Sequence, residues 1–225
     1  MRWSHLLFAH WRVPAAALTP HLPPGLRLDL FEGEAWLGVV PFLMSRVRPR
    51  CVPALPRLSL FPELNLRTYV VCGDRPGVWF FSLDAAEPWA VRLARWAWRL
   101  PYLHATMACT PDADGAVHYR SERTDRRAPP ARLAVRYRGV GAPFATAPGS
   151  LEHFLTARDC LYAFDHRDRL RRGDIAHDPW SLRHAEWEVE DCAMTAILDL
   201  APPDVPPHLL CADPLDVKAW LPVRV

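Results

Sequence analysis

The chain has 225 residues, of which 27 are Lys or Arg and 25 are Asp or Glu, so its formal net charge is +2. Half of the residues are hydrophobic and 23% are charged, the usual balance of a soluble globular protein, and this length builds a core without disulfides or metals. The near-neutral charge excludes binding of nucleic acid by bulk electrostatics, which needs clustered basic residues and a pI above about 9.

Short apolar runs separated by prolines predict a chain made mainly of strands. The sequence has 24 prolines, spread along its length, and proline ends or interrupts both strands and helices. The run from Ala35 to Val47 is nearly all apolar, which predicts a strand buried on both faces, interrupted or bulged at Pro41. The predicted strands cover residues 4–13, 26–30, 35–47, 63–72, 78–83, 106–110, 116–123, 132–138, 186–200 and 216–225.

Two short helices are expected among these strands. The first begins at Pro88 and ends near Arg99, and the second has Ser150 as its N-cap and ends near Asp159. No linker or change of composition divides the chain, so we expect one domain over residues 1–225. Many antiparallel strands with two short helices indicate a sandwich or a closed barrel.

The strand that begins at Glu63 carries the most informative pattern. Side chains alternate along a strand, so Glu63, Asn65, Arg67 and Tyr69 share one face. One interpretation is an ordinary solvated face. The other is a polar row on a cavity wall, in which the Arg67 fork binds a carboxylate, Asn65 donates a hydrogen bond and Glu63 acts as acid or base.

Other candidates depend on where the fold places them. His104 could be a general acid or base if it faces a cavity, with Tyr102 beside it at the rim. His5 and His10 are five residues apart and would face opposite sides of a regular strand, so they do not form a metal site there. We expect no metal and no cofactor, because the sequence has no phosphate loop, no complete dinucleotide fingerprint, no nucleophile elbow and no zinc signature.

The six cysteines and the N-terminus bear on the compartment. No two cysteines form a Cys-x-x-Cys pair, and single cysteines on apolar stretches are typical of buried thiols. We see neither a signal peptide nor an apolar stretch long enough to span a membrane. We therefore expect a cytoplasmic protein with reduced thiols that does not bind membranes.

Several segments resemble the YqjF-like family of uncharacterised bacterial proteins, which is grouped with the acetoacetate-decarboxylase-like superfamily. The resemblance spans roughly residues 3–220. The segments that carry it are 8–11, 22–26, 33–42, 63–70, 77–85, 100–102, 150–156 and 177–180. It implies an antiparallel, cone-like β barrel with a cavity inside and two or more flanking short helices.

The sequence departs from the decarboxylase at the residue that carries its chemistry. That enzyme forms a Schiff base on a lysine, which would be expected just before Leu100. Trp98 and Arg99 stand there instead, and arginine stays protonated. Lys218, near the C-terminus, is a weak substitute, whereas Glu63 matches a pocket glutamate of the decarboxylase. Asp159 stands where the family prefers tyrosine, which puts the role of that segment in doubt.

The sequence therefore predicts a barrel that binds a small organic acid or carbonyl compound. Whether it is an enzyme stays open: it could act on that ligand without a lysine Schiff base, or only hold or sense it. A third alternative is a partner-binding protein whose barrel is filled by its own side chains. The oligomeric state also stays open, homo-oligomers included.

Overall fold

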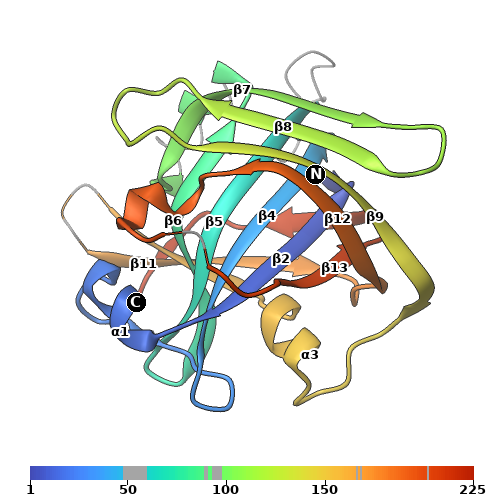
Figure 1. The fold of residues 1–225 in the computed structure, drawn as a ribbon. Coiled ribbons are helices and arrows are strands. Elements are labelled where there is room, and N and C mark those ends of the chain that lie inside the picture. Colours follow the sequence, from blue (N-terminus) through green and yellow to red (C-terminus); the bar gives the residue numbers. More distant parts are fainter. Residues whose placement is uncertain (48–59, 89–90, 93–97, 166, 168, 202) are drawn as a thin grey trace.

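The computed structural model describes residues 1–225 except 48–59, 89–90, 93–97, 166, 168 and 202. The chain is mainly strand, with few and short helices (Figure 1). The strands are β1 (Arg2–Ser4), β2 (Leu6–Val13), β3 (Arg27–Leu28), β4 (Ala35–Ser45), β5 (Phe61–Cys72), β6 (Arg75–Ala85), β7 (Tyr102–Pro111), β8 (Val117–Arg123), β9 (Arg132–Phe144), β10 (Cys160–Phe164), β11 (Leu170–His177), β12 (Leu182–Cys192), β13 (His208–Ala212), β14 (Leu215–Ala219) and β15 (Val223–Arg224). The helices are α1 (Ala15–Leu18), α3 (Leu151–Thr156) and the 3-10 turns η1 (Thr19–His21) and η2 (Thr195–Leu198).

Strand pairing closes the sheet into two rings that share one wall. The first ring runs β4-β5-β6-β7-β8-β9-β12-β13-β2 and returns to β4. The second ring runs β4-β5-β6-β10-β11-β14-β1 and returns to β4. Most pairings are antiparallel, but β6 is parallel to both β7 and β10. In Figure 1, β2, β4 and β5 cross the middle of the molecule and β8 arches over them. The prediction of a β-rich closed fold with short helices is confirmed.

Residues of the shared wall alternate between the two interiors. On β4, Leu37 and Val39 pack into the core of the first ring, whereas Val40 and Phe42 face the second. The expectation that residues 35–47 are buried on both faces is therefore confirmed for most of the strand, because β4 lies between two interiors. Pro41 does not interrupt β4, which pairs with β5 in unbroken register. On its other edge, pairing with β2 ends at Val39 and pairing with β1 begins at Leu43, so Pro41 falls where no neighbour needs its missing N–H.

The first ring is filled by its own side chains. Its core includes Leu7 and Ala9 of β2 and the buried rings of Tyr119 and Tyr137 from β8 and β9. The Tyr119 hydroxyl donates to the carbonyl oxygen of Glu63 at 2.7 Å, which satisfies a polar group that would otherwise be buried without a partner. A large cavity lies in the second ring.

Several predicted elements have different bounds in the structure. The strand expected over residues 4–13 divides at His5, which has a positive φ of 50°, so the regular strand assumed for His5 and His10 is wrong. The strand expected over 186–200 ends at Cys192, and the 3-10 turn η2 follows it. Ser150 is the N-cap of α3 as predicted, but α3 ends at Thr156.

Other elements were missed or cannot be compared. Three strands were not expected, namely β10, β11 and β13. The helix expected from Pro88 to Arg99 falls largely outside the described residues. In the part of the chain that the structure describes, the cysteines are free thiols, and no helix is long and apolar enough to cross a membrane.

Candidate functional site

The second ring encloses a cavity of about 1140 Å³. Its walls are mostly aliphatic and aromatic side chains from β1, β4, β5, β6, β10, β11 and β14. Three polar side chains enter it along β5, where Glu63, Asn65 and Arg67 lie on the same wall, and others, among them Arg158, His177 and Lys218, enter from other elements. Apolar walls with a few convergent polar groups are typical of sites for small molecules.

Alternation along β5 explains why these three side chains share the cavity. Leu64 and Leu66 fill the core of the first ring, so the residues between them must point into the second. Gly38 lies opposite Arg67 on β4 and leaves the room that this arrangement needs. A Cβ at Gly38 would lie 2.8 Å from the His10 ring and 3.3 Å from the Arg67 Cγ, so a larger residue would displace both side chains.

Arg67 is the cation of the polar wall. Its Nη2 donates to the Tyr69 hydroxyl and to the Leu155 carbonyl oxygen, each at 3.2 Å, and its Cζ lies 5.2 Å from the centre of the Phe8 ring. Its Nε is buried with no hydrogen-bond partner among the described residues. No described carboxylate lies within ion-pair distance of the guanidinium, which leaves its charge available to an anion.

His10 and Tyr69 hold Arg67 in place. The Tyr69 hydroxyl donates to the Leu155 carbonyl oxygen at 2.7 Å, so its one proton is committed there. The Nε2 of His10, 2.6 Å from the same hydroxyl, must then be the donor of that contact. Burial, reinforced by the charge of Arg67 and by His208, lowers the pKa of His10 well below 6.5, so the ring is neutral at pH 7. Tyr69, a predicted ligand contact, is not among the cavity-lining residues and supports Arg67 instead.

A second guanidinium lines the cavity beside the first. Arg158 is buried. Its guanidinium donates to the Asp29 carboxylate at 2.6 Å and to the Phe154 carbonyl oxygen at 2.7 Å. The Cζ atoms of Arg158 and Arg67 lie 5.0 and 5.6 Å from the centre of the Tyr69 ring. Because Arg158 is neutralised by Asp29 and Arg67 is not, Arg67 is the stronger candidate for binding an anion.

Glu63 forms the other polar centre of the wall. Its side chain is 3% exposed, and the Tyr102 hydroxyl donates to its Oε2 at 2.9 Å. Burial raises the pKa of Glu63 from 4.5 to about 8, and the hydrogen bond from Tyr102 offsets only part of that rise. Arg67 is not among the causes of this shift. The carboxyl group is therefore mostly protonated at pH 7.

Asn65 lies between Glu63 and Arg67 along the strand. It is buried, and its Oδ1 has no hydrogen-bond partner among the described residues. Since strand residues advance by about 3.3 Å, the backbone positions of Glu63 and Arg67 are roughly 13 Å apart. The wall therefore offers a proton donor at one end, a cation at the other and an unsatisfied amide between them.

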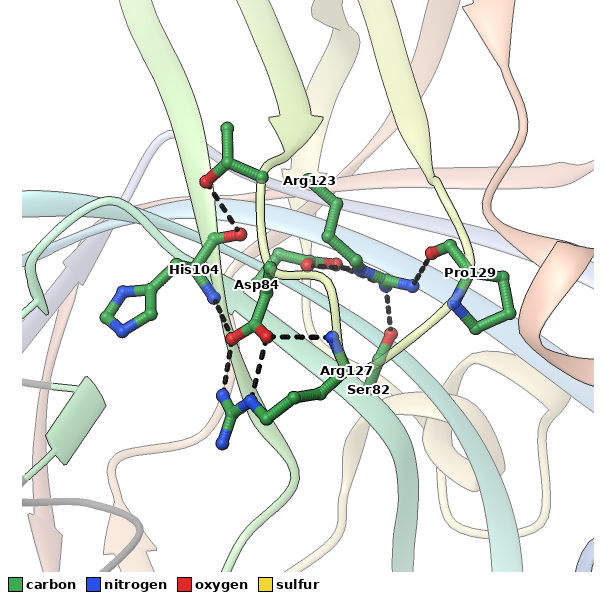
Figure 2. A network of polar contacts seen from close by, with 8 residues as sticks. Ser82, Asp84, His104, Arg123, Arg127 and Pro129 are labelled. Atoms are coloured by element: carbon green, nitrogen blue, oxygen red, sulfur yellow. Dashed lines mark hydrogen bonds and ion pairs between the residues drawn. The ribbon is translucent and has the colours of Figure 1, made fainter.

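The structure does not bring His104 into this cavity. His104 pairs with Ala85 where β7 meets β6, and its backbone N–H donates to an Asp125 carboxylate oxygen at 3.2 Å. Close by, the buried Arg123 guanidinium forms two 2.7 Å bonds to the Asp84 carboxylate and a 3.0 Å bond to Ser82 (Figure 2). The catalytic role considered for His104 required that it face the cavity, and its position gives that role no support.

The remaining sequence candidates have clear positions. Lys218 of β14 is exposed and lines the cavity. Trp98, close to the position expected for the decarboxylase lysine, also lines the cavity. Among the described residues, no group of three or more His, Cys, Asp and Glu side chains could hold a metal ion. Asp159 lies on the surface and pairs with Arg75 at 3.2 Å. The sequence did not predict that its neighbour Arg158 lines the cavity, because nothing in the local sequence distinguishes Arg158 from the many exposed arginines.

Comparison with known sequences places the chain in a family. The DUF2071 family, described as an uncharacterized conserved protein, matches residues 1–216. The chain belongs to the DUF2071 family. A relative in Bacillus subtilis (strain 168), the uncharacterized protein YqjF, is 39% identical over 218 residues, which are 97% of this chain and 88% of that protein. The resemblance seen in the sequence is therefore confirmed.

Solved structures show which fold this DUF2071 chain shares. An acetoacetate decarboxylase-like enzyme from Sphingomonas wittichii RW1 superimposes with a TM-score of 0.64 at 14% identity, covering 100% of this chain and 91% of that one. Acetoacetate decarboxylase from Legionella pneumophila gives 0.66 at 10% identity, with coverages of 100% and 86%. The enduracididine biosynthesis enzyme MppR complexed with pyruvate gives 0.62 at 12% identity, with coverages of 98% and 88%. At these identities the likeness establishes the acetoacetate-decarboxylase-like fold alone.

Proposed function

We propose that the protein binds an organic acid or carbonyl compound in the cavity of the second ring and acts on it by proton transfer from Glu63. The observation that carries the proposal is the Arg67 guanidinium, which lines an apolar cavity with no carboxylate partner among the described residues. A charge buried among apolar groups destabilises the protein unless an anion pairs with it. A ligand carboxylate is suited to this role, because the guanidinium fork can bond both of its oxygens.

Glu63 gives the cavity a group that can transfer a proton near neutral pH. With a pKa of about 8 it is mostly protonated at pH 7 and can donate a proton to a carbonyl oxygen or to a leaving group. Once it has donated, the same carboxylate can accept a proton, from carbon in an enolisation or lyase step or from water in a hydration. Tyr102 holds the carboxyl in position through its 2.9 Å hydrogen bond.

Ligand binding is the first test. Thermal unfolding is measured with a panel of 2-oxo acids, hydroxy acids and neutral carbonyl compounds, on wild type, Arg67→Ala and Arg67→Lys. A ligand at 100 times its Kd stabilises the folded state by about 2.7 kcal/mol, and Arg67→Ala should weaken binding by about 2–5 kcal/mol. Arg67→Lys keeps the charge and loses the fork, so it should retain only part of the affinity. Equal binding by all three proteins would remove Arg67 from the site.

Turnover is tested separately, because a protein that only holds its ligand would pass the first test. Ligands that bind are incubated with the protein in deuterated water, and exchange of the hydrogens next to the carbonyl group is followed by NMR. Wild type should exchange them faster than buffer does, whereas Glu63→Gln should bind the ligand and lose the exchange. Binding without exchange or product formation would favour a sensing module.

A further inference from the structure

The cavity is much larger than a short acid such as pyruvate requires. Its volume of about 1140 Å³ lies just above the range of sites that hold drug-sized ligands, which are roughly 300–1000 Å³. A three- or four-carbon acid at Arg67 would leave most of that volume bounded by apolar walls. Such walls interact favourably with hydrocarbon rather than with water.

The apolar part of the wall forms a continuous row that starts at Arg67. The guanidinium lies against Phe8, and the Phe8 ring meets Trp180 edge-on at 5.4 Å. Trp180 stacks on Trp3 at 6.2 Å, and Trp3 lies 5.4 Å from Phe42. Because Phe42 pairs with Glu63, this row connects the cation at one end of the polar wall with the carboxyl group at the other.

The distance between the two polar centres sets a length for the ligand. Their backbone positions are roughly 13 Å apart, and the Arg67 side chain bonds Tyr69 and Leu155, on the side away from Glu63. A fully extended chain advances about 1.2 Å per bond, since three backbone bonds span 3.3–3.6 Å. A ligand with its carboxylate on Arg67 can therefore reach Glu63 only if it carries a chain of about six to ten carbons.

We infer that the acid taken by this cavity is extended and amphipathic, with its carboxylate at Arg67, its hydrocarbon along the row of Phe8, Trp180 and Trp3, and its distal end at Glu63. The inference rests on the proposed function and names the substrate class of the same site.

The test uses straight-chain carboxylates from propanoate to dodecanoate, each below the concentration at which it forms micelles, with Kd measured by calorimetry. Affinity for wild type should rise about fourfold per methylene group and level off at about ten carbons. Octanol should bind at least 30-fold more weakly than octanoate. Trp3→Ala should reduce the gain in affinity per methylene group for the longer acids and leave the Kd of propanoate unchanged. Trp187→Ala is the matched control, because it removes a tryptophan from the core of the first ring; it should leave the gain in affinity per methylene group as in wild type.

The outcomes separate the two proposals. Equal Kd values at every chain length, abolished by Arg67→Ala, would overturn the extended ligand and leave anion binding at Arg67, the first part of the proposed function, standing. Binding that ignores Arg67→Ala, or octanol binding as tightly as octanoate, would overturn the anion site itself. The dependence of Kd on chain length in wild type tests the extended ligand even if Trp3→Ala fails to fold.

Discussion

The protonated state of Glu63 makes the stability of the protein depend on pH in a way that one substitution should abolish. Each pKa unit corresponds to about 1.36 kcal/mol, so a rise from 4.5 to about 8 makes the buried carboxylate cost about 5 kcal/mol relative to the unfolded chain. Below pH 4.5 the carboxyl is protonated in both states and contributes no difference. Between pH 4.5 and 8 the unfolded chain releases this proton while the folded protein keeps it. The free energy of unfolding therefore falls as the pH rises.

Glu63→Gln keeps the shape and polarity of the side chain and removes its titration. We expect the free energy of unfolding of wild type, minus that of Glu63→Gln, to decrease by about 5 kcal/mol between pH 4 and pH 9, with about 3 kcal/mol lost by pH 7. The measurement is urea unfolding of both proteins across that range. Taking the difference cancels the groups that they share.

The control is Glu122→Gln, which removes an exposed carboxyl on β8 and reports the general effect of one lost negative charge. A difference between wild type and Glu63→Gln that varies by less than about 1 kcal/mol over the whole range would refute the reasoning. Glu63 would then ionise like a solvated carboxyl, and it could not act as a proton donor at pH 7.

Three further predictions concern the packing and chemistry around the site. Gly38→Ala should lower the free energy of unfolding by about 1–3 kcal/mol, because its Cβ would lie 2.8 Å from the His10 ring; an unchanged urea midpoint would mean that the ring moves at no cost. Arg123→Met leaves the Asp84 carboxylate buried without its partner and should cost about 3–5 kcal/mol in the same assay, and a loss below 1 kcal/mol would contradict this. Lys218→Ala should bind 2-oxo acids as wild type does, and borohydride should trap no adduct on wild type; a trapped adduct on Lys218 would restore the imine mechanism.

Local patterns in the sequence were sufficient to predict the polar row on β5. Alternation is a property of any strand, so Glu63, Asn65 and Arg67 could be placed on one face before their surroundings were known. The apolar run on β4 likewise predicted burial of both faces. These features depend on the strand alone, and the structure contains them.

Features that depend on distant pairings could not be predicted in this way. The two rings exist because β4 pairs with both β1 and β2 and because β6 is parallel to both β7 and β10. Arg158 reaches the cavity only through this arrangement. The pKa of Glu63 also depends on it, since burial decides the shift and Arg67 is too far along the strand to oppose it.

The wall shared by the two rings has a consequence for how the family can diversify. Substitutions at 63, 65 and 67 change the chemistry offered to a ligand, while 64 and 66 continue to hold the filled core. Residues that contact a ligand and residues that fill the core therefore occupy alternate positions of one strand. Insertion or deletion of a single residue in β5 would exchange the two sets, sending charged groups into the core and leucines into the cavity. We expect the length of this strand to stay fixed among lineages even where residues 63, 65 and 67 differ.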